Sequence, residues 1–108
     1  MGVAQDAPIA DGQDLTLTVD AKTEKAKTWN ILAETTKGDD ANVQMVGAHL
    51  DGVTEGPGIN DNGTGSAAVL ETAAKLGAGA DVKNKVRFAL WGAEEEGLVG
   101  SEHYVSEL

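Results

Sequence analysis

The chain has 108 residues, with 18 acidic and 8 basic side chains, a formal net charge of −10 and no cysteine. This length predicts one domain with a core of its own, and the acidic balance argues against nucleic acid and membrane partners, which are themselves anionic. Without cysteine, the chain can have no disulfide, and any metal site must use His, Asp or Glu side chains.

The N-terminal part of the sequence predicts a tail followed by a hairpin. Residues 1–14 mix Gly, Pro, Asp and Ala without periodicity, which is typical of a tail or of the end of a preceding segment. Residues 15–19 alternate apolar and polar side chains and predict a half-buried strand, and residues 29–35 predict a second strand. We expect these two strands to pair antiparallel across the charged loop at 22–27.

The middle of the chain predicts a strand and a helix. A turn at 37–40 precedes a more continuously apolar strand at 43–48, which we expect to lie in the centre of the sheet. After a glycine-rich loop at 52–63, apolar residues at helical spacing predict a helix that faces inward. These residues are Val69, Leu70, Ala73 and Leu76, and Gly77 follows where a helix C-cap belongs.

The last part of the chain predicts a fourth strand at 85–91 and an acidic helix at 98–108. The helix before this strand can connect it to the strand at 43–48 by a right-handed crossover. The sequence therefore predicts an α/β fold. Its mixed β-sheet would combine the N-terminal antiparallel hairpin with the parallel strand-helix-strand crossover, and helices would pack on it.

Candidate metal ligands follow two of the predicted strands. His49 follows the third strand, Glu94 and Glu95 follow the fourth, and the loop between carries Asp61. Ligands of open α/β sheets bind at the carboxyl ends of strands, so we expect these side chains to converge. One imidazole and several carboxylates are the ligand set of a hydrolytic zinc site.

Each of these residues also has a structural interpretation when taken alone. A single histidine at a strand end can be a structural one, Asp61 can cap the helix that begins near Thr64, and Glu94 to Glu96 can form a solvated acidic turn. Two neighbouring glutamates in extended backbone point in opposite directions, so one can bind metal while the other transfers a proton. Asp51 is close enough in sequence to reach a ring nitrogen of His49.

Other motifs are poorly matched. Gly56-Pro57-Gly58 begins like a dinucleotide loop, but Asp61 stands where its third glycine belongs, and its charge opposes a pyrophosphate. The sequence has no phosphate-binding P-loop and no His-Glu-x-x-His helix, and Asp61-Asn62-Gly63 lacks the other ligands of a calcium loop.

Four segments together resemble the di-zinc aminopeptidase family that includes aminopeptidase Y and the secreted bacterial leucyl aminopeptidases. They are VGAHLD at 46–51, GPGINDNGTG at 56–65, VRFALWGAEE at 86–95 and GLVGS at 97–101. The resemblance covers about residues 28–105 and corresponds to the N-terminal half of the peptidase domain. Gly52 and Glu96 depart from the residues that the family usually has there.

The resemblance implies a role for each candidate residue. His49 would bind one zinc ion, Asp61 would bridge two ions and Glu95 would bind the second. Glu94 would be the general base, and Asp51 would orient His49. It also implies a cis peptide bond after Asp61, and it gives no ligand role to the other histidine of the chain.

The resemblance further implies a peptide substrate with a free N-terminus and a secreted or extracytoplasmic location. Residues 15–108 would form a partial zinc peptidase domain, and residues 1–14 the end of a protease-associated segment. The family completes each zinc site with one later Asp and one later His, so each ion would keep two protein ligands here. We therefore expect this chain alone to bind zinc weakly and to have little or no peptidase activity.

Two further hypotheses remain open. A non-catalytic α/β interaction module derived from the same family would also keep this fold. The apolar strand at 43–48, if it lacks a partner on one side, would leave a sheet edge through which the chain could self-associate.

Overall fold

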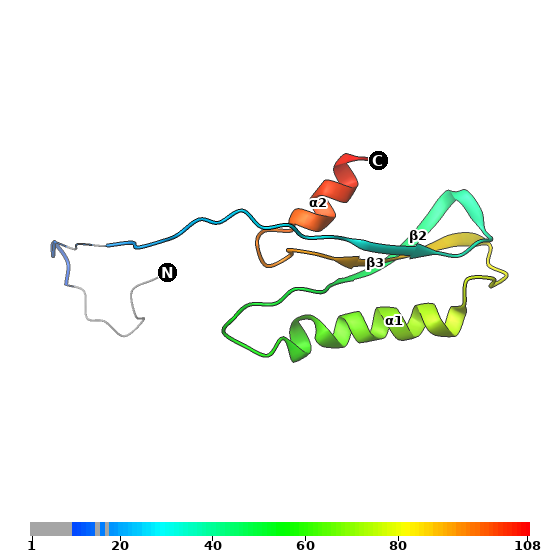
Figure 1. Ribbon diagram of the computed structural model, residues 1–108, viewed down its shortest axis with the longest axis horizontal. Coiled ribbons are helices and arrows are strands. Elements are labelled where there is room, and N and C mark those ends of the chain that lie inside the picture. The colour runs from blue at the N-terminus through cyan, green and yellow to red at the C-terminus, as the bar shows by residue number, and fades with distance from the viewer. Residues whose placement is uncertain (1–9, 15, 17) are drawn as a thin grey trace.

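The computed structural model describes residues 10–14, 16 and 18–108. In this part of the chain the elements are β1 (Ile31–Glu34), β2 (Asp39–His49), the irregular turn η1 (Ile59–Gly63), α1 (Thr64–Leu76), β3 (Asn84–Trp91) and α2 (Val99–Ser106). The fold is a small α/β layer, with α1 along one face of the sheet and α2 on the other (Figure 1). The predicted α/β fold class with a mixed β-sheet is confirmed.

The sheet has the order β1-β3-β2 and mixed strand directions. β2 and β3 are parallel, with Val46 opposite Phe88, and α1 makes the connection between them. β1 lies antiparallel on the other side of β3, with Ala33 opposite Phe88. The predicted strand-helix-strand unit is confirmed, and it brings the ends of β2 and β3 to the same edge of the sheet.

The predicted N-terminal hairpin is wrong. Leu15 and Leu17 lie outside the described residues, while Thr16, Thr18 and Val19 are exposed and belong to no strand. β1 pairs with β3 instead, although β3 is more than 50 residues later in the chain. Alternating side chains suit a strand, but they do not specify its partner.

The expectation that the strand at 43–48 is central is also wrong. It is part of β2, which lies at an edge, and β3 is the central strand. Phe88 and Ala89 of β3 are 7% and 1% exposed, whereas Met45 and Val46 of β2 are 41% and 37% exposed. An apolar run therefore belongs to the edge here, because only one side of β2 is paired within the described residues.

The core lies between α1 and the sheet. Ala48, Val69 and Phe88 are buried together, with Ala73 and Leu76 packed against them. Gly77 ends the helix as predicted, with a positive φ of 75° and its N–H donated to the carbonyl of Ala73. Leu70 was predicted to face inward with these residues, but it is 64% exposed.

The other face of the sheet is only partly covered. Tyr104 of α2 packs on Trp91 of β3 with ring centroids 5.3 Å apart, and the Tyr104 hydroxyl accepts a hydrogen bond from Arg87.

Among the described residues, no helix has both the length and the apolar character needed to cross a membrane.

Candidate metal centre

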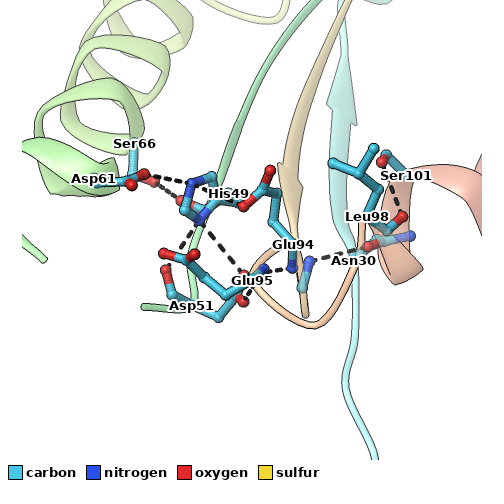
Figure 2. Close-up of polar contacts among 10 residues, drawn as sticks. Asn30, His49, Asp51, Asp61, Ser66, Glu94, Glu95, Leu98 and Ser101 are labelled. Carbon is cyan, nitrogen blue, oxygen red and sulfur yellow. Dashed lines mark hydrogen bonds and ion pairs between the residues drawn. The ribbon is translucent and has the colours of Figure 1, made fainter. Parts of the chain in front are cut away.

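The predicted site residues meet at the carboxyl edge of the parallel strands. His49 is the last residue of β2, and Glu94 and Glu95 lie in the loop that follows β3. Asp61 reaches the same place from η1, directly before α1. Figure 2 shows the imidazole of His49 between Asp61 on one side and the Glu94–Glu95 turn on the other.

His49 is held at both ring nitrogens and is 7% exposed. Its Nδ1 lies 3.0 Å from the backbone carbonyl of Asp51, and its Nε2 lies 2.9 Å from Oδ1 of Asp61. A carbonyl oxygen can only accept, so Nδ1 must carry a proton and donate it. In the neutral ring the lone pair is then on Nε2, where a metal ion would bind.

The surroundings of His49 raise its pKa. Burial alone would lower the pKa of His49, but the Asp51 carbonyl, the Asp61 carboxylate and the nearby charge of Glu94 outweigh it and raise the pKa above its usual 6.5. Nε2 faces Oδ1 of Asp61 at the position that a cation would take. A metal binds only the unprotonated nitrogen, so metal binding here would compete with protonation.

Asp51 contacts His49 in a different way from that expected. Its backbone carbonyl accepts from Nδ1, while its carboxylate lies 3.6 Å from the same nitrogen. The carboxylate instead accepts the backbone N–H groups of Glu94 at 2.9 Å and of Glu95 at 3.0 Å. Burial would raise the pKa of Asp51, but these two amides, with the charge of His49, hold it below 3.8.

The three proposed ligands form one cluster. His49, Asp61 and Glu95 each offer a donor atom, and these atoms lie within 4.8 Å of one another. Burial and the negative charges of Asp61 and Glu94 raise the pKa of Glu95 above 4.5. One imidazole nitrogen and two carboxylate oxygens that repel each other fit a zinc ion, which these ligand types bind and whose charge would relieve the repulsion.

Glu94 lies beside the cluster and outside the ligand group. Its Oε2 is 3.5 Å from Nε2 of His49, and its side chain is 33% exposed. A carboxylate in this position can reach both the metal position and solvent. It is therefore placed to exchange protons with a water molecule at the cluster.

Asp61 does not cap helix α1, which was its alternative structural role. The N-cap residue of α1 is Gly63, which makes no side-chain capping bond, while the Asp61 carboxylate contacts His49. The peptide bond between Asp61 and Asn62 is cis, as the resemblance implied. His103, the second histidine, lies on α2 next to Glu107 with an exposed side chain and takes no part in the cluster.

Two residues that support the site were missed in the sequence. Ser66 of α1 donates its hydroxyl to the carbonyl of His49 at 2.6 Å and so ties the helix to the end of β2. Asn30 contacts both ends of the loop that carries Glu94 and Glu95. Neither residue forms a motif by itself, and the partners of Asn30 are 62 and 70 residues away, so the sequence holds no local signal for them.

Comparisons with known proteins identify the family of this chain. The model of peptidase family M28 matches residues 30–108. The probable lipoprotein aminopeptidase LpqL of Mycobacterium tuberculosis is 59% identical over 93 residues, which cover 86% of this chain and 19% of that protein. An aminopeptidase of Pseudomonas aeruginosa is 63% identical over 94 residues, 87% of this chain and 17% of that protein.

A fungal relative extends the match. The probable leucine aminopeptidase 2 of Arthroderma benhamiae is 52% identical over 101 residues, 93% of this chain and 20% of that protein. This chain thus spans about a fifth of the length of these relatives. Since the family model covers most of the sequence and the expected resemblance is confirmed, the chain belongs to peptidase family M28, a family of zinc metallopeptidases.

Proposed function

We propose that this chain supplies zinc ligands and the general base of an aminopeptidase, a hydrolase that removes N-terminal residues from peptides. The observation that carries the proposal is the convergence of His49, Asp61 and Glu95 within 4.8 Å, with Glu94 beside them. Membership of peptidase family M28 supports the same reaction class.

The zinc ligands would be Nε2 of His49 and the carboxylates of Asp61 and Glu95. When bound, zinc lowers the pKa of a coordinated water and polarises the scissile carbonyl. By the resemblance, Asp61 would bridge two zinc ions, and each ion would then have two protein ligands from this chain. The cluster could instead bind one ion through three protein ligands, which is the number that catalytic zinc sites generally have.

Glu94 would take a proton from the attacking water and pass it to the leaving amine. Its distance of 3.5 Å from Nε2 of His49 and its partial exposure suit this role. Asp51 would act as a positioning residue, because its carbonyl holds the imidazole and its carboxylate holds the backbone of Glu94 and Glu95.

The substrate would be a peptide with a protonated N-terminal amine. An open cleft of about 390 Å³ lies beside Glu95, and its lining includes Asp51, Glu55 and Glu96. The negative charge of these carboxylates favours a cationic amine over an anion. The name leucine aminopeptidase 2 of the fungal relatives supports an apolar first residue, and the name lipoprotein aminopeptidase of LpqL supports an extracytoplasmic location.

We also propose that this chain alone binds zinc weakly and hydrolyses little peptide. It spans about a fifth of the length of its relatives, and the resemblance assigns further ligands to later residues. At zinc saturation, hydrolysis of leucine p-nitroanilide by this chain is then expected to stay close to the rate without protein. Turnover that depends on Glu94 would contradict this part of the proposal.

Zinc titration calorimetry on matched histidine variants tests the proposed function. We expect saturable binding in the wild type, loss of binding in His49→Ala and unchanged binding in His103→Ala, because His103 lies outside the cluster. Glu95→Gln should weaken binding without changing the fold. Equal losses in the two histidine variants, or no binding by a folded wild type, would contradict the zinc site and favour a non-catalytic interaction module.

A further inference from the structure

We propose that Asn30 is a positioning residue that fixes the Glu94–Glu95 turn relative to His49 by joining the two ends of the loop that carries it. The inference rests on the proposed function, because that function gives the turn its role. Asn30 lies directly before β1 and contacts none of the proposed ligands.

The side chain of Asn30 uses both of its polar atoms on this loop. Its Oδ1 accepts the backbone N–H of Gly92 at 3.2 Å, and its Nδ2 donates to the carbonyl of Gly100 at 2.7 Å. Gly92 follows β3 and Gly100 lies in the first turn of α2, so one amide group spans the loop from its beginning to its end. In Figure 2 the Glu94 turn separates Asn30 from His49.

The packing around these contacts leaves no room for a side chain at either end of the loop. A Cβ atom at Gly92 would collide with the hydroxyl of Thr28, and one at Gly100 would collide with Oδ1 of Asn30. The backbone also closes the loop directly, because the N–H of Gly100 donates to the carbonyl of Gly92 at 3.0 Å. The glycine at position 100 thus leaves room for the Asn30 side chain, and the glycine at position 92 leaves room for the neighbouring residues Thr28 and Trp29.

The loop between these ends has a conformation that needs support. Ala93 and Leu98 have positive φ values of 53° and 60°, in the left-handed region that residues with a side chain rarely adopt. Such residues persist only where the surrounding structure holds them. Backbone hydrogen bonds within the loop, such as that from the Leu98 N–H to the Glu94 carbonyl, give part of this support. Among the side chains, Asp51 contacts the loop at Glu94 and Glu95, and Asn30 contacts it at its two ends.

An asparagine suits this position because it has both a donor and an acceptor. Aspartate would keep an acceptor for Gly92 but would turn a carboxylate oxygen toward the carbonyl of Gly100, where Asn30 now donates. Alanine would leave the N–H of Gly92 and the carbonyl of Gly100 without their hydrogen bonds to residue 30. Both substitutions should therefore release the loop, and aspartate should not rescue it.

Cobalt titration tests the proposal, since the visible absorption of Co²⁺ reports its ligands. We expect the dissociation constant for Co²⁺ to rise about tenfold or more in Asn30→Ala and Asn30→Asp, as is typical when a residue that orients a metal ligand is removed. Asn42→Ala is the matched control, because Asn42 is exposed near the start of β2 and its side chain donates to the Asp39 carboxylate rather than to the loop. It should leave the dissociation constant unchanged.

A double-mutant cycle separates positioning from general destabilisation. If Asn30 acts through Glu95, Asn30→Ala should cause little further loss of Co²⁺ affinity in a Glu95→Gln background. An equal fold-loss in both backgrounds would overturn the proposal.

Amide hydrogen exchange tests the same proposal without metal. In Asn30→Ala the N–H groups of Glu94 and Glu95 should exchange at least tenfold faster relative to that of Val86, which donates to the buried Thr35. An unchanged ratio would overturn the inference. If the wild type binds no Co²⁺, the proposed function fails, and the exchange ratio still decides whether Asn30 positions the turn.

Discussion

Replacing Asp51 with asparagine removes a carboxylate that accepts two backbone amides. Its oxygens lie 2.9 Å from the Glu94 nitrogen and 3.0 Å from the Glu95 nitrogen, and its pKa is held below its usual range. Asparagine can accept only one of these amides and turns its own NH₂ group toward the other. The variant therefore loses one charge-assisted hydrogen bond and weakens the second.

The structure gives the expected size of this effect. A hydrogen bond to a charged group contributes about 1.5–3 kcal/mol, and we take the lower part of this range because the Asp51 side chain is 26% exposed. We expect Asp51→Asn to lower the free energy of unfolding by about 2 kcal/mol, which should reduce the urea midpoint by about 1–2 M for a domain of this size.

Urea unfolding followed by circular dichroism at pH 7 in a chelating buffer measures this loss. Asp81→Asn is the control, because the Asp81 side chain is 96% exposed and lies 4.0 Å from its nearest cation, Lys37. Since the folded pKa of Asp51 is lowered, its contribution is present above 3.8 and is lost as the pH falls through the folded value. Equal midpoints for the two variants at pH 7 would refute the proposed role of the carboxylate.

Three further predictions concern the rest of the fold. The pKa of Asp39 is lowered by hydrogen bonds from the Asn42 side chain and from a backbone amide, so an NMR titration should place its midpoint below 3.8. Any stability that the Asp39 carboxylate adds should be lost as the pH falls through that midpoint. A midpoint at or above 3.8 would contradict this prediction. Phe88 is 7% exposed in the core, so Phe88→Ala should cost about 3 kcal/mol or more in thermal or urea unfolding, and a loss below about 1 kcal/mol would show that the core is elsewhere. We also propose that the chain self-associates through the outer edge of β2, where Met45 is 41% exposed. Sedimentation velocity should show concentration-dependent association, and Met45→Lys should reduce it. Equal association of the wild type and the variant would exclude this edge as the interface.

The sequence was most informative where structure is local. Helical spacing and Gly77 placed α1 correctly, and the apolar run before Trp91 placed β3. A strand, a helix and a strand in succession allow few arrangements, so the parallel pairing of β2 and β3 could be predicted. The hairpin failed because strand pairing is not local, and the partner of β1 is β3.

The same distinction applies to the candidate site. His49 and the Glu94–Glu95 pair could be found because they lie at or shortly after the carboxyl ends of strands, and strand order then brings them together. The carboxylate of Asp51 was assigned to its sequence neighbour His49, but its hydrogen bonds go to amides 43 and 44 residues away. Contacts of this kind depend on loop geometry that appears only once the sheet is assembled.

Backbone amide NMR during a zinc titration tests the metal site most directly. We predict saturable chemical-shift changes confined to residues 49–63 and 92–97, because these segments carry His49, Asp61, Glu94 and Glu95. The changes should disappear in His49→Ala and persist in His103→Ala. A folded chain whose amides in both segments do not respond to zinc would contradict the claim that these residues form a metal centre.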